Sequence, residues 1–254
     1  MADKERVLQG LGPRHPSIPL QLLQETDSTN LRLKEGLREG VLSAPCLMIA
    51  ESQTAGRGRL GRAFISPPGT GLYMSLLYRP EGAWDPGRIT ILAAVAVCRA
   101  VEEATGLQPG IKWVNDLFLR GKKICGILAE ATLEHVIIGI GLNLRTPPGG
   151  FPEAAGPAGA LDTNVDRLLL AGKIAGYLLD GLQDLSHPAI IQGYRQRMFL
   201  TGREIQYRKN GEQKNALVTG VDDTGGLMIR DAQGDHILRT GEVSLGSASL
   251  SRLE

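Results

Sequence analysis

The sequence has few residues that could build a disulfide framework or a metal centre. Its 254 residues include only three cysteines and four histidines, and their spacing fits no known metal-binding pattern. The cysteines, Cys46, Cys98 and Cys125, are odd in number, widely spaced and surrounded by apolar residues. This pattern is typical of reduced, buried thiols. We therefore expect a cytoplasmic protein without disulfides and without a metal site built from side chains.

Long apolar segments, a strong net charge and aromatic residues are also scarce. The longest apolar run, 91–98, is far shorter than the roughly 20 residues that a membrane helix needs. The polar N-terminus lacks the apolar core of a signal peptide. A net charge of +1 and an aromatic content of 4% provide neither a general attraction for nucleic acid nor a platform for stacking bases. These absences argue against membrane insertion and DNA binding.

The most unusual stretch combines glycine with arginine directly after the apolar run 45–50. Its members are Gly56, Arg57, Gly58, Arg59, Gly61 and Arg62. Glycine lets the backbone approach a ligand, and arginine pairs well with carboxylate and phosphate. The spacing also matches a dinucleotide-binding fingerprint, but 66–69 (Ser-Pro-Pro-Gly) follows where that fingerprint needs a helix. We therefore expect a loop that encloses an anion, with a solvated basic loop as the alternative.

Apolar periodicity predicts an α+β chain in two parts. Strands are expected at 18–24, 45–50, 72–78, 109–113, 117–119, 123–130 and 135–143. Helices are expected at 31–37, 90–105, 164–182 and 188–199, with a loose lead-in at 1–16 and a long mobile loop at 145–162. From Thr201 onward, short alternating runs are separated by turn sequences such as Asn210-Gly211. This second part predicts a small barrel of four or five strands.

Polar residues follow the first predicted strand and lie on a later one. Ser28, Thr29 and Asn30 precede a leucine pattern, so they either cap the helix that follows or face a small polar ligand. Lys112 lies on a short apolar strand, where a lysine needs a partner. That partner is either a core carboxylate or an anionic ligand. Lys112 together with Arg57 and Arg59 would suit the attack of one anion on another, such as a carboxylate on ATP.

Five motifs occur in an order that resembles the biotin protein ligases. They are Thr26-x-Ser-Thr-Asn30, Gly56-Arg-Gly-Arg-x-Gly-Arg62, Lys112-Trp-x-Asn-Asp116, Lys123-x-x-Gly-Ile-Leu128 and Gly139-Ile-Gly-x-Asn143. The resemblance implies a mixed-sheet catalytic domain, like that of class II aminoacyl-tRNA synthetases, at 1–200. A small SH3-like β-barrel is implied at 201–254. The lack of a preceding DNA-binding domain resembles the short, non-repressor class of the family.

The resemblance also implies an ATP-dependent ligase reaction in two steps. Biotin and MgATP form biotinyl-5′-AMP and pyrophosphate. The biotinyl group is then transferred to a lysine of the biotin carboxyl carrier protein of acetyl-CoA carboxylase. The implied requirements are therefore biotin, ATP, Mg²⁺ and a carrier protein, and a homodimer is compatible with the resemblance.

Roles for individual residues are carried over from the motifs that they match. Residues implied to bind biotin are Ser28, Thr29, Asn30, Gln53, Arg57, Gly58, Arg59, Lys112, Gly139 and Gly141. Residues implied to bind ATP or the adenylate are Arg57, Arg59, Arg62, Lys112, Asn115, Asn143 and Phe151. The catalytic set is Lys112, Arg57 and Arg59. Phe151 is expected to cover the adenine.

Two departures from the family pattern and two other functions bear on this interpretation. Val114 stands where the family usually has proline, which predicts a slightly different turn before Asn115. The loop 145–162 matches the family only by its position. The alternatives are a lipoate–protein ligase, which shares the architecture, and a non-enzymatic module that binds RNA or protein. The glycine-arginine loop and the Lys-Trp-x-Asn-Asp motif favour biotin.

Overall fold

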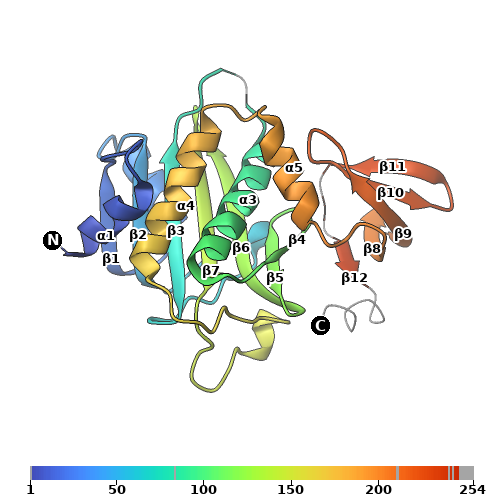
Figure 1. Cartoon of the computed structure of the whole chain (residues 1–254), viewed down its shortest axis with the longest axis horizontal. Coiled ribbons are helices and arrows are strands. Elements are labelled where there is room, and N and C mark those ends of the chain that lie inside the picture. Colours follow the sequence, from blue (N-terminus) through green and yellow to red (C-terminus); the bar gives the residue numbers. More distant parts are fainter. Residues whose placement is uncertain (1, 83, 210–211, 240, 242, 246–254) are drawn as a thin grey trace.

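The structure, a computed structural model, describes residues 2–82, 84–209, 212–239, 241 and 243–245. They form a large mixed sheet flanked by helices and a second, smaller sheet near the C-terminus (Figure 1). This mixed arrangement confirms the predicted α+β class. No helix in the described part of the chain is both long and apolar enough to cross a membrane.

The large sheet has seven strands in the order β1-β2-β3-β7-β6-β5-β4. They are β1 (Leu20–Thr26), β2 (Cys46–Gln53), β3 (Gly71–Tyr78), β4 (Gly110–Lys112), β5 (Asp116–Leu119), β6 (Lys122–Thr132) and β7 (His135–Asn143). Strands β1 and β2 are parallel, and the other neighbours are antiparallel. Each strand overlaps a segment that the sequence predicts from a short apolar run or from alternating apolar residues.

Helices cover both faces of this sheet. The elements are α1 (Ala2–Leu11), α2 (Thr29–Arg38), α3 (Pro86–Thr105), α4 (Arg167–Leu182) and α5 (Pro188–Arg197). Alternation along β2 directs Leu47 and Ile49 into the main core with α3 and α4. Cys46 and Met48 face the opposite way and pack with Leu33 of α2. The large sheet is therefore a central layer with a thick helical layer on one face and α2 on the other.

The predicted loose lead-in at 1–16 is wrong, because α1 packs tightly against α4. Val7 is fully buried and Leu11 is 5% exposed. Glycines let the two helices approach: a Cβ atom on Gly172 would lie 2.1 Å from the carbonyl oxygen of Val7 and 2.8 Å from the Cα of Gly10. The four-residue spacing of Val7 and Leu11 was the signal for this helix, but its short apolar stripe lies among charged residues.

We expect Gly172→Ala to lower the free energy of unfolding by about 1–3 kcal/mol, the usual cost of overpacking a core. The added methyl group must push α1 away, because the atoms that it meets belong to the backbone. Gly193→Ala is the control, since its Cβ atom would meet only the ends of side chains, Val95 at 3.2 Å and Arg197 at 3.5 Å. Chemical denaturation compares the two variants. Equal stability of both would contradict the tight packing of α1.

The second sheet is antiparallel and has the order β11-β10-β9-β8-β12. Its strands are β8 (Glu204–Lys209), β9 (Glu212–Val221), β10 (Leu227–Asp231), β11 (Gly234–Leu238) and β12 (Val243–Leu245). The predicted strand-rich segment after Thr201 is therefore present, although the Asn210-Gly211 turn lies outside the described residues. The second sheet contacts the large one: the indole Nε1 of Trp113 donates a hydrogen bond to the Gly225 carbonyl, at 2.9 Å.

A buried carboxylate, that of Asp231, closes the β10–β11 hairpin. It makes the stability of the second sheet depend on pH. The Tyr207 hydroxyl donates a hydrogen bond to Asp231, and so does the backbone N–H of Gln233, at 2.7 Å. The hydrogen bond from Tyr207 is the main reason why the pKa of Asp231 falls from 3.8 to about 2. A carboxyl group whose pKa is lower in the folded protein than in the unfolded chain stabilises the fold at pH values above its unfolded pKa. This stabilisation is lost as the pH falls towards 2.

We therefore expect Asp231→Asn to unfold at a lower temperature than the wild type at pH 7. The difference should shrink as the pH falls from about 4 to 2, because the wild-type carboxylate is then protonated as well. Thermal unfolding followed by circular dichroism across this range measures it. Tyr207→Phe, which removes the main donor to the carboxylate, should show part of the same loss. A difference that stays constant over this pH range would contradict the assignment.

Candidate ligand-binding site

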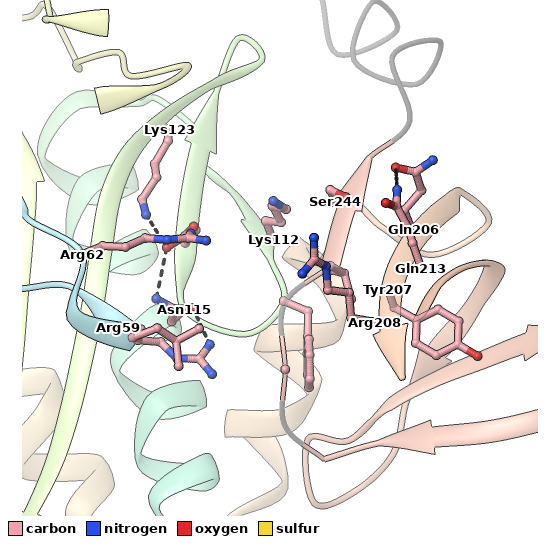
Figure 2. A pocket seen from close by; sticks show the side chains of 15 residues that line it. Arg59, Arg62, Lys112, Asn115, Lys123, Gln206, Tyr207, Arg208, Gln213 and Ser244 are labelled. Carbon is pink, nitrogen blue, oxygen red and sulfur yellow. Dashed lines mark hydrogen bonds and ion pairs between the residues drawn. The ribbon is translucent and has the colours of Figure 1, made fainter. Parts of the chain in front are cut away.

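Two cavities on the α2 side of the large sheet share one residue, Asn115. The larger measures about 730 Å³ and lies between the glycine-arginine loop, the β4–β5 turn and the second sheet (Figure 2). The smaller, of about 40 Å³, lies over β3, β6 and β7, next to the start of α2. We call them the outer cavity and the inner pocket. Their shared residue places the predicted anion-binding groups beside the predicted polar ligand-binding groups.

The glycine-arginine loop folds back on itself as a small hairpin. The Gly58 N–H donates to the Arg62 carbonyl at 2.7 Å, and the Phe64 N–H donates to the Gly56 carbonyl at 2.8 Å. The last glycine, Gly61, ends a short 3-10 turn (Arg59–Gly61), and the next element is strand β3, so the prediction of a loop instead of a dinucleotide-binding helix is confirmed. Arg57 lines the inner pocket, whereas Arg59 and Arg62 line the outer cavity.

Lys112 is the last residue of β4 and lines the outer cavity. It is half-buried, and its Nζ lies 5.8 Å from the centre of the Phe118 ring. Figure 2 shows it between Arg62 and Asn115 on one side and Arg208 of β8 on the other. The nearby carboxylate of Asp116 pairs with Lys123 at 2.6 Å. The Trp113–Val114 peptide bond, at the departure from the family pattern, is cis.

The outer cavity is strongly cationic. Its lining includes five cationic side chains, Arg59, Arg62, Lys112, Lys123 and Arg208, and one carboxylate, Asp116. A cluster of this sign attracts and holds polyanions such as phosphates. Arg59 is fixed in place, because its Nη1 donates to the Asn115 Oδ1 at 3.0 Å. The cavity therefore suits a ligand with several negative charges.

Two of these cations were missed by the sequence reasoning. Lys123 opens one of the five motifs, so a signal existed, but it received no role. Arg208 had no signal, because it reaches the cavity only through the packing of the second sheet against the first. Gln206, Gln213 and Ser244 of the second sheet line the cavity for the same reason.

The inner pocket is lined by buried polar side chains from several elements. Ser28, Thr29 and Asn30 are 2%, 3% and 4% exposed. Ser28 is the N-cap residue of α2, but its side chain makes no capping hydrogen bond. Gln53 accepts a hydrogen bond from the Thr29 N–H at 2.9 Å and donates one to Ser66 at 3.0 Å. The helix-capping alternative for the side chains of 28–30 is therefore wrong, and these residues line the pocket instead.

The two predicted glycines of β7 make room for side chains of the pocket. A Cβ atom on Gly139 would lie 2.3 Å from the Asn30 Oδ1, and one on Gly141 would lie 2.4 Å from the Phe64 ring. Phe64 also packs edge to face on Tyr73, with ring centres 6.4 Å apart. Sequence reasoning missed Phe64, although it is the first aromatic residue after the arginines. Its ring occupies part of the pocket and so limits the free volume.

Three predicted residues, Gly58, Asn143 and Phe151, line neither cavity. The Asn143 Nδ2 donates to the Gly159 carbonyl at 2.9 Å, and Asn143 is 7% exposed. This bond holds the loop 145–162, whose residues 157–159 also pair with Lys123. Phe151 lies in this loop and lines neither the outer cavity nor the inner pocket.

Among the described residues, no group of three or more His, Cys, Asp or Glu side chains could hold a metal ion.

Comparisons with known proteins agree with this geometry. Residues 22–143 match the model of the "Biotin/lipoate A/B protein ligase family". The biotin–[acetyl-CoA-carboxylase] ligase of Paracoccus denitrificans is 32% identical over 246 residues, covering 89% of this chain and 100% of the relative. The bifunctional ligase/repressor BirA of Bacillus subtilis is 32% identical over 223 residues, and the chain spans about two thirds (66%) of its length.

A solved structure matches most of this chain. It is the biotin protein ligase of Aquifex aeolicus in complex with biotin and ATP, with a TM-score of 0.78 and 29% sequence identity. The match covers 91% of this chain and 99% of the Aquifex chain. Together with the full-length similarity to the Paracoccus enzyme, it shows that this chain belongs to the biotin protein ligase family.

Proposed function

We propose that this protein is a biotin–protein ligase. It activates biotin with ATP and transfers the biotinyl group to a lysine of a carboxylase's biotin carrier domain. The observation that carries the proposal is the junction of the two cavities at Asn115: a small polar pocket opens beside a cationic cavity of about 730 Å³. The relatives named as biotin ligases support the same assignment.

In the first step, a biotin carboxylate oxygen attacks the α-phosphorus of ATP and pyrophosphate leaves. Both reactants are anions, so the step needs cations that offset their repulsion and hold them in line. Lys112 supplies the charge where the carboxylate and the α-phosphate meet. Arg59 and Arg62 hold the phosphates from the loop. Ser28, Thr29, Asn30 and Gln53 position the ring system of biotin in the inner pocket, beside Gly139 and Gly141.

Mg²⁺ fits the oxygen groups of the outer cavity. It usually takes one or two protein carboxylates and completes its shell with phosphate oxygens and water. Asp116, the one carboxylate among the described residues that line the cavity, would hold the ion. When bound there with ATP, the ion would offset negative charge on the phosphates.

In the second step, a lysine amine of the carrier attacks the carbonyl carbon of biotinyl-5′-AMP, and AMP leaves. Until then the mixed anhydride must be kept from water. Arg57, Gly58 and Arg59 enclose it from the loop side. We assign Phe151 to the adenine when the loop 145–162 closes, and Asn143 to holding that loop through Gly159.

The catalytic domain covers 1–200, and the second sheet belongs to a small SH3-like barrel at 201–254.

Calorimetric titration of the purified protein with biotin, with and without MgATP, tests the proposal. We expect biotin to bind, and to bind far more tightly when MgATP allows the adenylate to form. Lipoate is the control ligand, since lipoate ligases share the architecture. Binding of lipoate without binding of biotin would replace the proposal with lipoate ligation.

A further inference from the structure

A chain of hydrogen bonds runs beneath the inner pocket and ends at Glu130, which lines neither cavity. Asn30 Nδ2 donates to the Glu130 carboxylate at 2.8 Å, and Ser75 Oγ donates to Asn30 Oδ1 at 2.6 Å. The Ser75 and Thr29 hydroxyls lie 2.7 Å apart. Ser75 is fully buried, and Thr29 and Asn30 are nearly so. Three elements, β6, α2 and β3, are thereby joined by one polar network.

Glu130 sets the orientation of the Asn30 amide. A carboxylate can only accept hydrogen bonds, so it requires the amide nitrogen of Asn30 to face it. The Leu128 carbonyl, 3.4 Å from the same nitrogen, is a second acceptor on that side. The amide oxygen of Asn30 must then face Ser75.

This orientation fixes the direction of the two hydroxyl groups. Ser75 has a single hydroxyl proton, and the Asn30 oxygen at 2.6 Å takes it. The Thr29 hydroxyl must therefore donate to Ser75 at 2.7 Å. Its contact with the Gln53 Oε1, at 3.2 Å, is left without a proton. Gln53 instead receives the Thr29 backbone N–H, at 2.9 Å.

The consequence lies in the inner pocket, which Thr29 and Gln53 both line. With the proton of Thr29 turned towards Ser75, the Thr29 hydroxyl and the Gln53 carbonyl both offer lone pairs. Two neighbouring acceptors suit a ligand with N–H donors on a ring. The cyclic urea of biotin has two such donors, whereas the dithiolane ring of lipoate has none.

We propose that Glu130 is a specificity-determining positioning residue: acting through Asn30 and Ser75, it makes the inner pocket an acceptor site for ring N–H groups. The inference rests on the proposed function, because the ligand with these donors is biotin. Glu130 itself lines neither cavity. It acts on the pocket by setting which groups of Asn30, Ser75 and Thr29 donate hydrogen bonds and which accept them.

Substitutions at Glu130 that differ in hydrogen-bonding character test the proposal by calorimetry with biotin. Glu130→Gln retains an acceptor oxygen for Asn30, so biotin affinity should stay within about threefold. Glu130→Lys offers only donors, so the Asn30 amide should turn its oxygen towards the new ammonium group. The Thr29 hydroxyl should then become a donor, which opposes the N–H donors of the ligand. We expect about 10- to 100-fold weaker biotin binding, the range for one unpaired buried polar group. Glu134→Lys, on an exposed carboxylate of the β6–β7 turn, is the charge-matched control and should bind as the wild type does.

Two further measurements separate this role from a structural one. In steady-state kinetics, Glu130→Lys should raise the KM for biotin while leaving the KM for ATP and kcat within about threefold. A biotin analogue with a ring N–H replaced by oxygen should bind the wild type about tenfold more weakly than biotin, and Glu130→Lys should not discriminate between the two ligands. Ser75→Ala, which removes the acceptor for the Thr29 proton, should resemble Glu130→Lys and serves as the test if that variant does not fold.

The outcomes distinguish this inference from the proposed function. If the wild type binds no biotin, the proposed function itself fails. If the wild type binds biotin and the Gln and Lys variants lose affinity equally, Glu130 acts through its charge or its fold, and the inference is overturned. Wild-type affinity in both Glu130→Lys and Ser75→Ala would overturn it as well.

Discussion

Replacement of Lys112 by alanine is expected to slow adenylate formation by about 10²-fold or more, the usual effect of removing one group that stabilises charge in a transition state. Lys112 ends β4 and lines the cationic cavity beside Asn115, where the inner pocket opens. Arg59 and Arg62 lie on one side of Lys112 and Arg208 lies on the other (Figure 2), so each of these cations occupies a different place in the cavity. Single-turnover formation of biotinyl-5′-AMP measures the effect.

The fold should survive this change, because the core residue of β4 is its neighbour Ile111, which is fully buried. Lys122→Ala, an exposed lysine at the start of β6, is the matched control and should react as the wild type does. Lys112→Arg, which keeps the charge but alters its shape, should recover part of the rate. If Lys112→Ala forms the adenylate at the wild-type rate, the catalytic assignment is wrong.

Arg59→Ala should release biotinyl-5′-AMP about 10- to 100-fold faster, the range for losing one charged hydrogen bond. Arg59 ties the glycine-arginine loop to the β4–β5 turn through its 3.0 Å hydrogen bond to Asn115. Without this bond the loop no longer closes the outer cavity, so the adenylate escapes and meets water. A chase of preformed labelled adenylate with excess unlabelled biotin and ATP measures the rate.

The affinity for biotin alone should change much less, since Arg59 does not line the inner pocket. Arg79→Ala serves as the control, because that arginine is exposed and pairs with Glu134 outside the site. An equal loss of biotin affinity and adenylate retention in Arg59→Ala would show that the residue supports the whole site and not only the closed loop.

Local sequence patterns were sufficient to locate the strands of the large sheet and the residues on their ends. The apolar runs of β2 and β7 identify buried strands directly. Lys112, Asn115 and Arg59 are separated by as many as 56 positions in the chain, and all three line one cavity. Their motifs carry the signal because each one lies beside a strand whose position was predicted correctly.

What the sequence could not reveal depends on contacts between distant segments. Arg208 reaches the outer cavity only because the second sheet packs on Trp113. Glu130 matters only because Asn30, 100 positions earlier, lies against it. The packing of α1 depends on Gly172, which in the sequence is an ordinary glycine within a predicted helix. Only the structure shows that Val7 lies beside it. None of these pairs leaves a pattern in either segment alone.

Biotin-dependent exchange of labelled pyrophosphate into ATP tests the central claim most directly, because it reports reversible formation of the adenylate and needs no carrier protein. We expect exchange that requires biotin, is not supported by lipoate and is nearly abolished in Lys112→Ala. Exchange with lipoate but not with biotin, or no exchange with either acid, would contradict the assignment of this protein as a biotin ligase.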